Sequence, residues 1–150
     1  MPIEPRLFIK TAMVYLGLTF LAGVILAAAE AFQHPLPPII AIEHGHAGFV
    51  GWLVNVVIGV ALWMFPLDTR RFPESKGRYP VRAVIVAYLA LNVGLPLRLI
   101  FEPWVALADN PAVSALLIFG ALLQFAAIAI VGFVVWVRIK APARAPARTR

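Results

Sequence analysis

The stretch Glu43–Phe65, EHGHAGFVGWLVNVVIGVALWMF, decides how the rest of the chain is interpreted. It is apolar over slightly more than the ~20 residues that an α-helix needs to cross a bilayer, yet it begins with His44 and His46. Two helical residues two positions apart point about 200° apart, because each residue turns roughly 100°. The segment can therefore offer a ring nitrogen to each of two neighbours. Ionisable side chains within a membrane span are costly, which makes this pair a candidate for function.

The whole chain has the composition of an integral membrane protein. Of its 150 residues, 62% are hydrophobic and only 13% are charged, whereas soluble domains are about half apolar and one quarter charged. The apolar residues form four blocks, at about 7–31, 43–65, 81–100 and 112–137. Because lipid cannot satisfy backbone hydrogen bonds, each block predicts an α-helix. The sequence predicts an all-α membrane protein with four transmembrane helices in an antiparallel bundle over residues 1–140.

The basic residues predict the orientation of these helices. They surround the start of the chain, the connection 66–80 and the C-terminal segment, while the other two connections carry mainly acidic residues. The positive-inside rule then places both termini in the cytoplasm and the histidine pair near the outer face. This distribution accounts for the net charge of +6 without any nucleic-acid partner. Residues 141–150 alternate Ala, Pro and Arg and predict a disordered basic tail.

The histidine pair allows several kinds of chemistry. Histidine is an axial ligand of haem iron and also binds zinc and copper. Phe49 and Trp52 follow the pair and could wall a ring system. The chain contains no cysteine, and two histidines alone do not complete a closed zinc site, although Glu43 could add a third ligand. Alternatively, His44 and His46 only hydrogen-bond water or carbonyl groups at the membrane boundary.

Arg98 is the second unusual group, because it lies near the outer end of the third block at about the depth of the histidines. Its planar guanidinium could hold a carboxylate such as a haem propionate. It could instead extend toward the headgroups or pair with Glu102 one helical turn later. The uncharged polar residues Asn55, Asn92 and Gln124 favour interhelical hydrogen bonds.

Two segments resemble a known family. The pair His44 and His46, followed by Gly59 and the run Trp63–Pro66, resembles a haem-ligating helix of subunit I of haem–copper oxidases and nitric-oxide reductases. In that family such a pair gives one histidine to each of two haems. The run Gly94–Arg98 is similar to the oxidase segment whose two adjacent arginines hold haem propionates, with Leu97 in the place of the first arginine.

The resemblance implies a small four-span protein of the subunit I-like kind in a bacterial inner membrane. It implies b-type haem near the outer face, with His44 and His46 as axial ligands and Arg98 on a propionate. Because the two histidines diverge, we expect adjacent protomers to contribute them to one haem, with Trp52 and Phe49 against the ring. By analogy with the three four-helix arcs of subunit I, the assembly would be a homotrimer. No histidine follows His46, so the copper centre is missing. Electron transfer is then expected rather than complete terminal oxidase activity, and the redox partner is not indicated.

Two alternatives belong to other functional classes. The chain could be a cofactor-free membrane subunit or assembly factor, in which the histidines only form hydrogen bonds between helices. It could instead bind copper or zinc through Glu43, His44 and His46.

Overall fold

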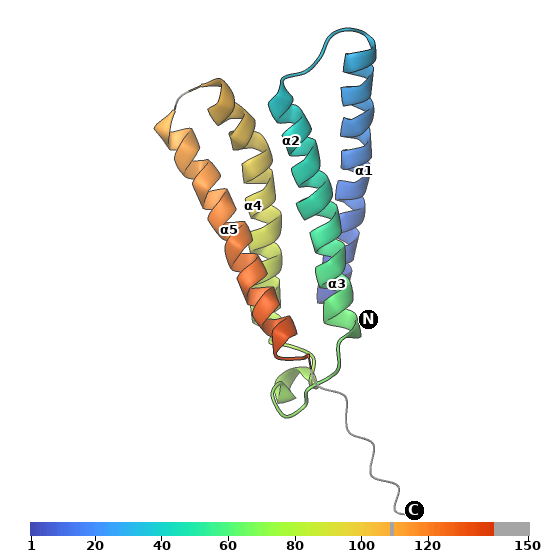
Figure 1. Cartoon of the computed structure of the whole chain (residues 1–150). Coiled ribbons are helices and arrows are strands. Elements are labelled where there is room, and N and C mark those ends of the chain that lie inside the picture. Colours follow the sequence, from blue (N-terminus) through green and yellow to red (C-terminus); the bar gives the residue numbers. More distant parts are fainter. Residues whose placement is uncertain (109, 140–150) are drawn as a thin grey trace, which may run out of the picture.

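A computed structural model describes residues 1–108 and 110–139, and it shows four long antiparallel helical spans (Figure 1). Each span is long and apolar enough to cross a membrane. This confirms the predicted all-α, four-span architecture of a multi-pass membrane protein. The first span is α1 Ile3–Ala31. The second consists of α2 Pro38–His46, the π-helix η1 Ala47–Val54 and α3 Asn55–Met64. The short 3₁₀ helix η2 Pro73–Ser75 follows, and then the third and fourth spans, α4 Val81–Leu107 and α5 Pro111–Trp136.

The helices extend beyond the first three apolar blocks, and at two of them the extension involves proline. The second span begins at Pro38 instead of residue 43, because a proline at the first helical position gives up no hydrogen bond. The third begins at Val81 as predicted but continues through Pro96 and Pro103 to Leu107 instead of ending near residue 100. Prolines are tolerated within membrane helices when neighbouring groups compensate for the missing hydrogen bond. The predicted tail 141–150 lies outside the described residues.

The four spans are arranged as two hairpins that meet along one seam (Figure 1). α1 packs against the second span, and α4 packs along α5; α2 and η1 then contact α4 between the hairpins. We call the end with the connection 32–37, the C-terminus of α4 and the N-terminus of α5 the histidine end, since α2 lies there. We call the opposite end, with residues 1–4, 65–80 and 136–139, the termini end (Figure 1).

Glycines of the second span face α1. A Cβ added to Gly51 would lie 2.5 Å from the Tyr15 ring, and similar close contacts surround Gly48 and Gly59. The close helix approach at these glycines is packing within one chain. Gly94 and Gly120 play the same part between α4 and α5, because a Cβ on Gly94 would lie 2.6 Å from the Gly120 carbonyl oxygen.

The π-helix η1 begins at the residue after His46, and nothing in the sequence pattern predicted it. A π-turn closes its hydrogen bonds five residues apart rather than four, so its side chains follow a different register from that of an α-helix. Such turns are frequent at functional sites. The second span is thus α-helical up to His46, π-helical over the eight residues of η1 and α-helical again from Asn55.

Candidate functional site at the histidine end

His46 stands at the centre of a small polar cluster between α2 and α4. Its Nδ1 lies 3.6 Å from Glu43 Oε2, on the preceding turn of the same helix. The same nitrogen lies 3.6 Å from Glu102 Oε2 on α4. One ligand atom from each of these three residues lies within 4.8 Å of the others. The cluster therefore joins the two hairpins through groups that can bind a metal or share a proton.

Glu43 is the most unusual member of this cluster. The residue is only 8% exposed, and neither carboxylate oxygen accepts a hydrogen bond within the described structure. A buried polar group without a partner costs free energy, and most buried polar groups in proteins are satisfied. The buried Glu43 carboxylate therefore needs a bound proton or a neighbouring cation to compensate its charge.

Arg98 joins the cluster through Glu102. Its Nε donates a 2.6 Å hydrogen bond to Glu102 Oε2 one turn later on α4. This is the pairing that the sequence offered as an alternative to a ligand carboxylate. No other hydrogen bond of the Arg98 guanidinium is found among the described residues. With both carboxylates ionised and His46 neutral, the cluster carries one more negative than positive charge.

His44 lies on a different side of α2. Its Cε1 would be 3.2 Å from a Cβ added to Gly23, so its ring packs against α1. Its Nδ1 is buried and makes no hydrogen bond in the described part of the chain. The two histidines therefore diverge, as helix geometry predicted. The structure brings His46 and Arg98 together through Glu102 and leaves His44 apart from them.

The two aromatic residues proposed to wall a ring system differ in exposure. Phe49 is 63% exposed and presents its ring to the surroundings rather than to the core of this chain. Trp52 is partly buried within η1. A planar ligand beside Phe49 would thus lie on the outside of this protomer.

Below the cluster, Asn55 and Asn92 form the interhelical amide pair that the sequence predicted. Asn55 Nδ2 donates to Asn92 Oδ1 at 3.2 Å, and Asn92 Nδ2 donates to Asn55 Oδ1 at 3.1 Å. Asn55 Nδ2 also donates to the Gly51 carbonyl of η1. Gln124 packs beside Gly94, and its buried Nε2 finds no hydrogen-bond partner among the described residues.

The termini end contains a buried arginine that sequence reasoning missed. Arg138 was grouped with the basic residues of the C-terminal segment, but it is fully buried. Its guanidinium donates hydrogen bonds to three carbonyl oxygens at and just beyond the C-terminus of α3, those of Leu62, Phe65 and Pro66. Burial lowers the pKa of Arg138 from its ordinary value. No pattern in the sequence distinguishes Arg138 from its basic neighbours.

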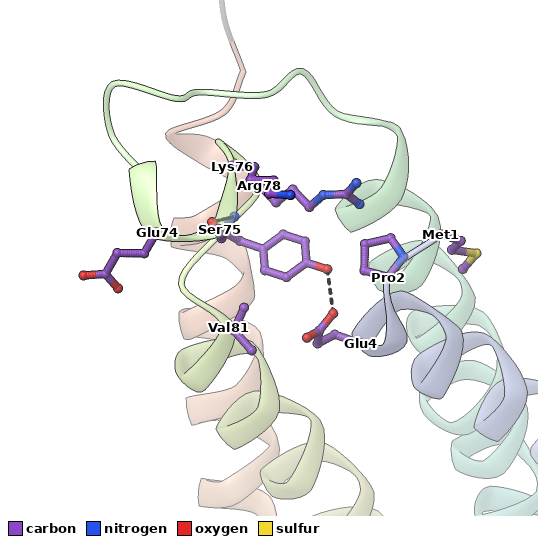
Figure 2. A pocket seen from close by; sticks show the side chains of 9 residues that line it. Met1, Pro2, Glu4, Glu74, Ser75, Lys76, Arg78 and Val81 are labelled. Atoms are coloured by element: carbon purple, nitrogen blue, oxygen red, sulfur yellow. Dashed lines mark hydrogen bonds between the residues drawn. The ribbon is translucent and has the colours of Figure 1, made fainter.

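Tyr79 extends this network to α1. Its ring lies 5.6 Å from the Arg138 guanidinium, and its hydroxyl donates a 3.1 Å hydrogen bond to Glu4 Oε2, the dashed line in Figure 2. Burial, and then the neighbouring Glu4 carboxylate, raise the pKa of Tyr79 well above its usual range. Tyr79 therefore remains a neutral donor, and the network ties α1, α3, the connection 65–80 and the end of α5 together.

Comparison with known proteins adds no family to this description. No family model matches the chain, and neither a curated protein nor a solved structure matches it. The geometry of the two ends is therefore the basis for assigning a function.

Proposed function

We propose that this protein binds b-type haem in the membrane and carries single electrons, with His46 as an axial ligand. The orientation of the His46 ring supports this proposal. Its Nδ1 faces the carboxylates of Glu43 and Glu102, which leaves Nε2 as the nitrogen available to a metal. Metal-ligating histidines usually donate their other ring N–H to a carboxylate or carbonyl, which fixes the ring and increases its basicity.

Other residues of the chain would complete such a site. Arg98 uses only Nε toward Glu102, so its terminal nitrogens can still donate to a propionate. His44 would supply the second ligand to a haem held by an adjacent protomer. Its Nδ1 is buried where the ring packs against α1, so its Nε2 would be the coordinating nitrogen. Phe49 and Trp52 would contact the ring face. Bound between two imidazoles, haem iron supplies one-electron redox chemistry.

The oligomeric state of the protein and its orientation in the membrane belong to the same proposal. The exposed Phe49 favours a haem shared between copies, and we propose a homotrimer. The charge distribution favours a termini end in the cytoplasm of a bacterial cell and a histidine end near the outer face of its inner membrane. Complete dioxygen reduction is not proposed, because no histidine beyond His46 is present to hold copper.

The test is the haem absorbance of protein purified from cells supplied with haemin. We expect a b-type spectrum that is lost in His46→Ala and altered in His44→Ala. His34→Ala is the matched control, because His34 is exposed in the connection between α1 and α2 and should leave the spectrum unchanged. An unaltered spectrum in both the His44 and His46 variants would contradict the assignment.

A second candidate function is direct binding of a single metal ion by Glu43, His46 and Glu102. The specific observation is that His46 Nδ1 lies 3.6 Å from an oxygen of each carboxylate, with all three ligand atoms within 4.8 Å of one another. Ligand atoms ~2.1 Å from a tetrahedral ion lie ~3.4 Å from one another, so the nitrogen–oxygen distances are already close to those of a metal site. One nitrogen and two oxygens suit Zn²⁺, Mn²⁺ or Fe²⁺. Glu102 takes the place that the sequence gave to His44, which faces α1 instead.

Glu102→Gln separates the two candidates, because it removes one ligand charge and keeps the shape. Direct ion binding requires that the bound metal falls well below one equivalent in this variant, measured by elemental analysis. Haem binding through Nε2 requires that haem content is retained. A protein that carries neither haem nor metal in its unaltered form would instead be a cofactor-free subunit or assembly factor.

A further inference from the structure

We propose that the α4–α5 hairpin binds one anionic phospholipid at the termini end. The headgroup would occupy a polar cavity beside the connection 65–80, and one acyl chain would lie in the apolar groove that adjoins it. This site is distinct from the histidine cluster and does not depend on the proposed haem function.

The polar cavity has a volume of about 890 Å³ and lies outside the membrane spans, beside η2 and the first turn of α4. Arg71 and Arg82 line it, together with Ser75 and Glu74. Both arginines are exposed, and within the described residues neither guanidinium donates a hydrogen bond or joins an ion pair. The cavity thus offers two uncommitted guanidinium groups against one carboxylate, a set that favours a phosphate anion.

An apolar groove continues from this cavity into the membrane-spanning region. It has a volume of about 440 Å³ and shares Phe72 and Pro80 with the polar cavity. Its other lining residues come from facing turns of α4 and α5 and are all apolar: Ala83, Ala129, Ile130, Phe133 and Val134. The small side chains of Ala83 and Ala129 form the hollow, and the 64% exposed Phe133 stands beside it.

The polar cavity and the adjoining apolar groove together indicate the class of ligand. A free phosphate would use only the polar cavity, and a non-ionic detergent would leave the two arginines without a partner. A zwitterionic lipid would bring a cationic amine beside them. A phospholipid with a net negative headgroup satisfies both, since its phosphate sits at the membrane surface and its chain runs along the helices. Each Lys or Arg near the surface attracts anionic lipid by roughly 1 kcal/mol, so Arg71 and Arg82 should select strongly for charge.

The test is native mass spectrometry of the full chain released from detergent, with phosphatidylglycerol and phosphatidylethanolamine of identical acyl chains supplied together. We expect one phosphatidylglycerol to be retained preferentially. The double variant Arg71→Gln/Arg82→Gln should reduce that preference roughly thirtyfold. The matched control Arg6→Gln/Arg70→Gln removes the same charge from exposed residues that do not line the cavity and should have little effect.

A groove variant tests the acyl chain separately. Ala129→Phe fills the groove at an exposed position and should lower retention of both lipids, whereas Ala126→Phe, exposed on α5 outside the groove, should not. Equal losses in the two arginine double variants would overturn the proposal, because they would indicate diffuse attraction. So would equal retention of the two lipids, or displacement of bound lipid by excess inorganic phosphate.

Discussion

The two ends of the bundle treat buried polar groups in opposite ways. At the termini end, Arg138 donates to three carbonyl oxygens and Tyr79 donates to Glu4. At the histidine end, Glu43 and the Nδ1 atoms of both histidines are buried without hydrogen bonds. A satisfied polar network stabilises a fold, whereas an unsatisfied one is a cost that natural proteins accept mainly at functional sites. The difference indicates that the network at the termini end holds the helices together, and it supports our proposal of a ligand at the histidine end.

The largest effect should come from removing the buried arginine. In Arg138→Ala the carbonyls of Leu62, Phe65 and Pro66 lose a charged donor, and we expect the free energy of unfolding to fall by roughly 3 kcal/mol. Reversible unfolding in mixed detergent micelles measures this. Arg6→Ala, at an exposed position of α1, is the control and should change the unfolding free energy little. If Arg138→Ala lowered the unfolding free energy only slightly, the hydrogen-bonded network at the termini end would not be what stabilises the fold.

The histidine end should respond with the opposite sign. Glu43→Leu removes a buried carboxylate that has no donor, so we expect the ligand-free protein to become more stable by about 1–2 kcal/mol. The same unfolding assay applies, with Glu74→Leu in the exposed connection as the control. Destabilisation by Glu43→Leu would mean that Glu43 is a structural residue.

The Asn55–Asn92 pair lies between the two ends, and its two amides are hydrogen-bonded to each other. Asn55→Leu leaves Asn92 without its partner, and we expect a loss of about 1 kcal/mol in unfolding free energy. The double variant Asn55→Leu/Asn92→Leu should recover most of that loss, because no buried amide is then left unpaired. Simple addition of the two single losses would show that the amides act independently.

The smallest effect concerns pH at the termini end. Burial and the Glu4 carboxylate raise the pKa of Tyr79 above its ordinary value of 10.0, so in alkali the folded protein binds a proton that the unfolded chain has lost. The contribution of Tyr79 to stability is therefore complete below pH 10 and declines as the pH rises above it. Tyr79→Phe should show a shallower fall of the melting temperature above this pH than the unaltered protein. Parallel curves would mean that Tyr79 does not titrate with unfolding.

Much of the fold was readable from composition alone, because ~20 apolar residues in a row have few structural options. The divergence of His44 and His46 was equally predictable, since it follows from the helical turn. The helix limits near the prolines were not predicted, because local preference alone does not show that Pro38 can start a helix or that α4 continues through Pro96. The π-helix after His46 packs against α1 and α4, and no single-sequence pattern reveals it.

The candidate site was only partly predictable. Glu43 and Arg98 were recognised because charges within apolar stretches are conspicuous. Glu102 was foreseen only as a partner of Arg98, because its approach to His46 depends on how α2 meets α4. Arg138 was hidden among other basic residues, and its burial depends on the position of the α3 C-terminus, far away in the sequence.

The most direct test of the central claim is the haem and metal content of one purified sample, measured together by pyridine haemochrome and elemental analysis. If His46 is a haem ligand, the unaltered protein and His34→Ala will contain b-type haem with matching iron, and His46→Ala will contain neither. A colourless protein after growth with haemin, or full haem in His46→Ala, would contradict the account.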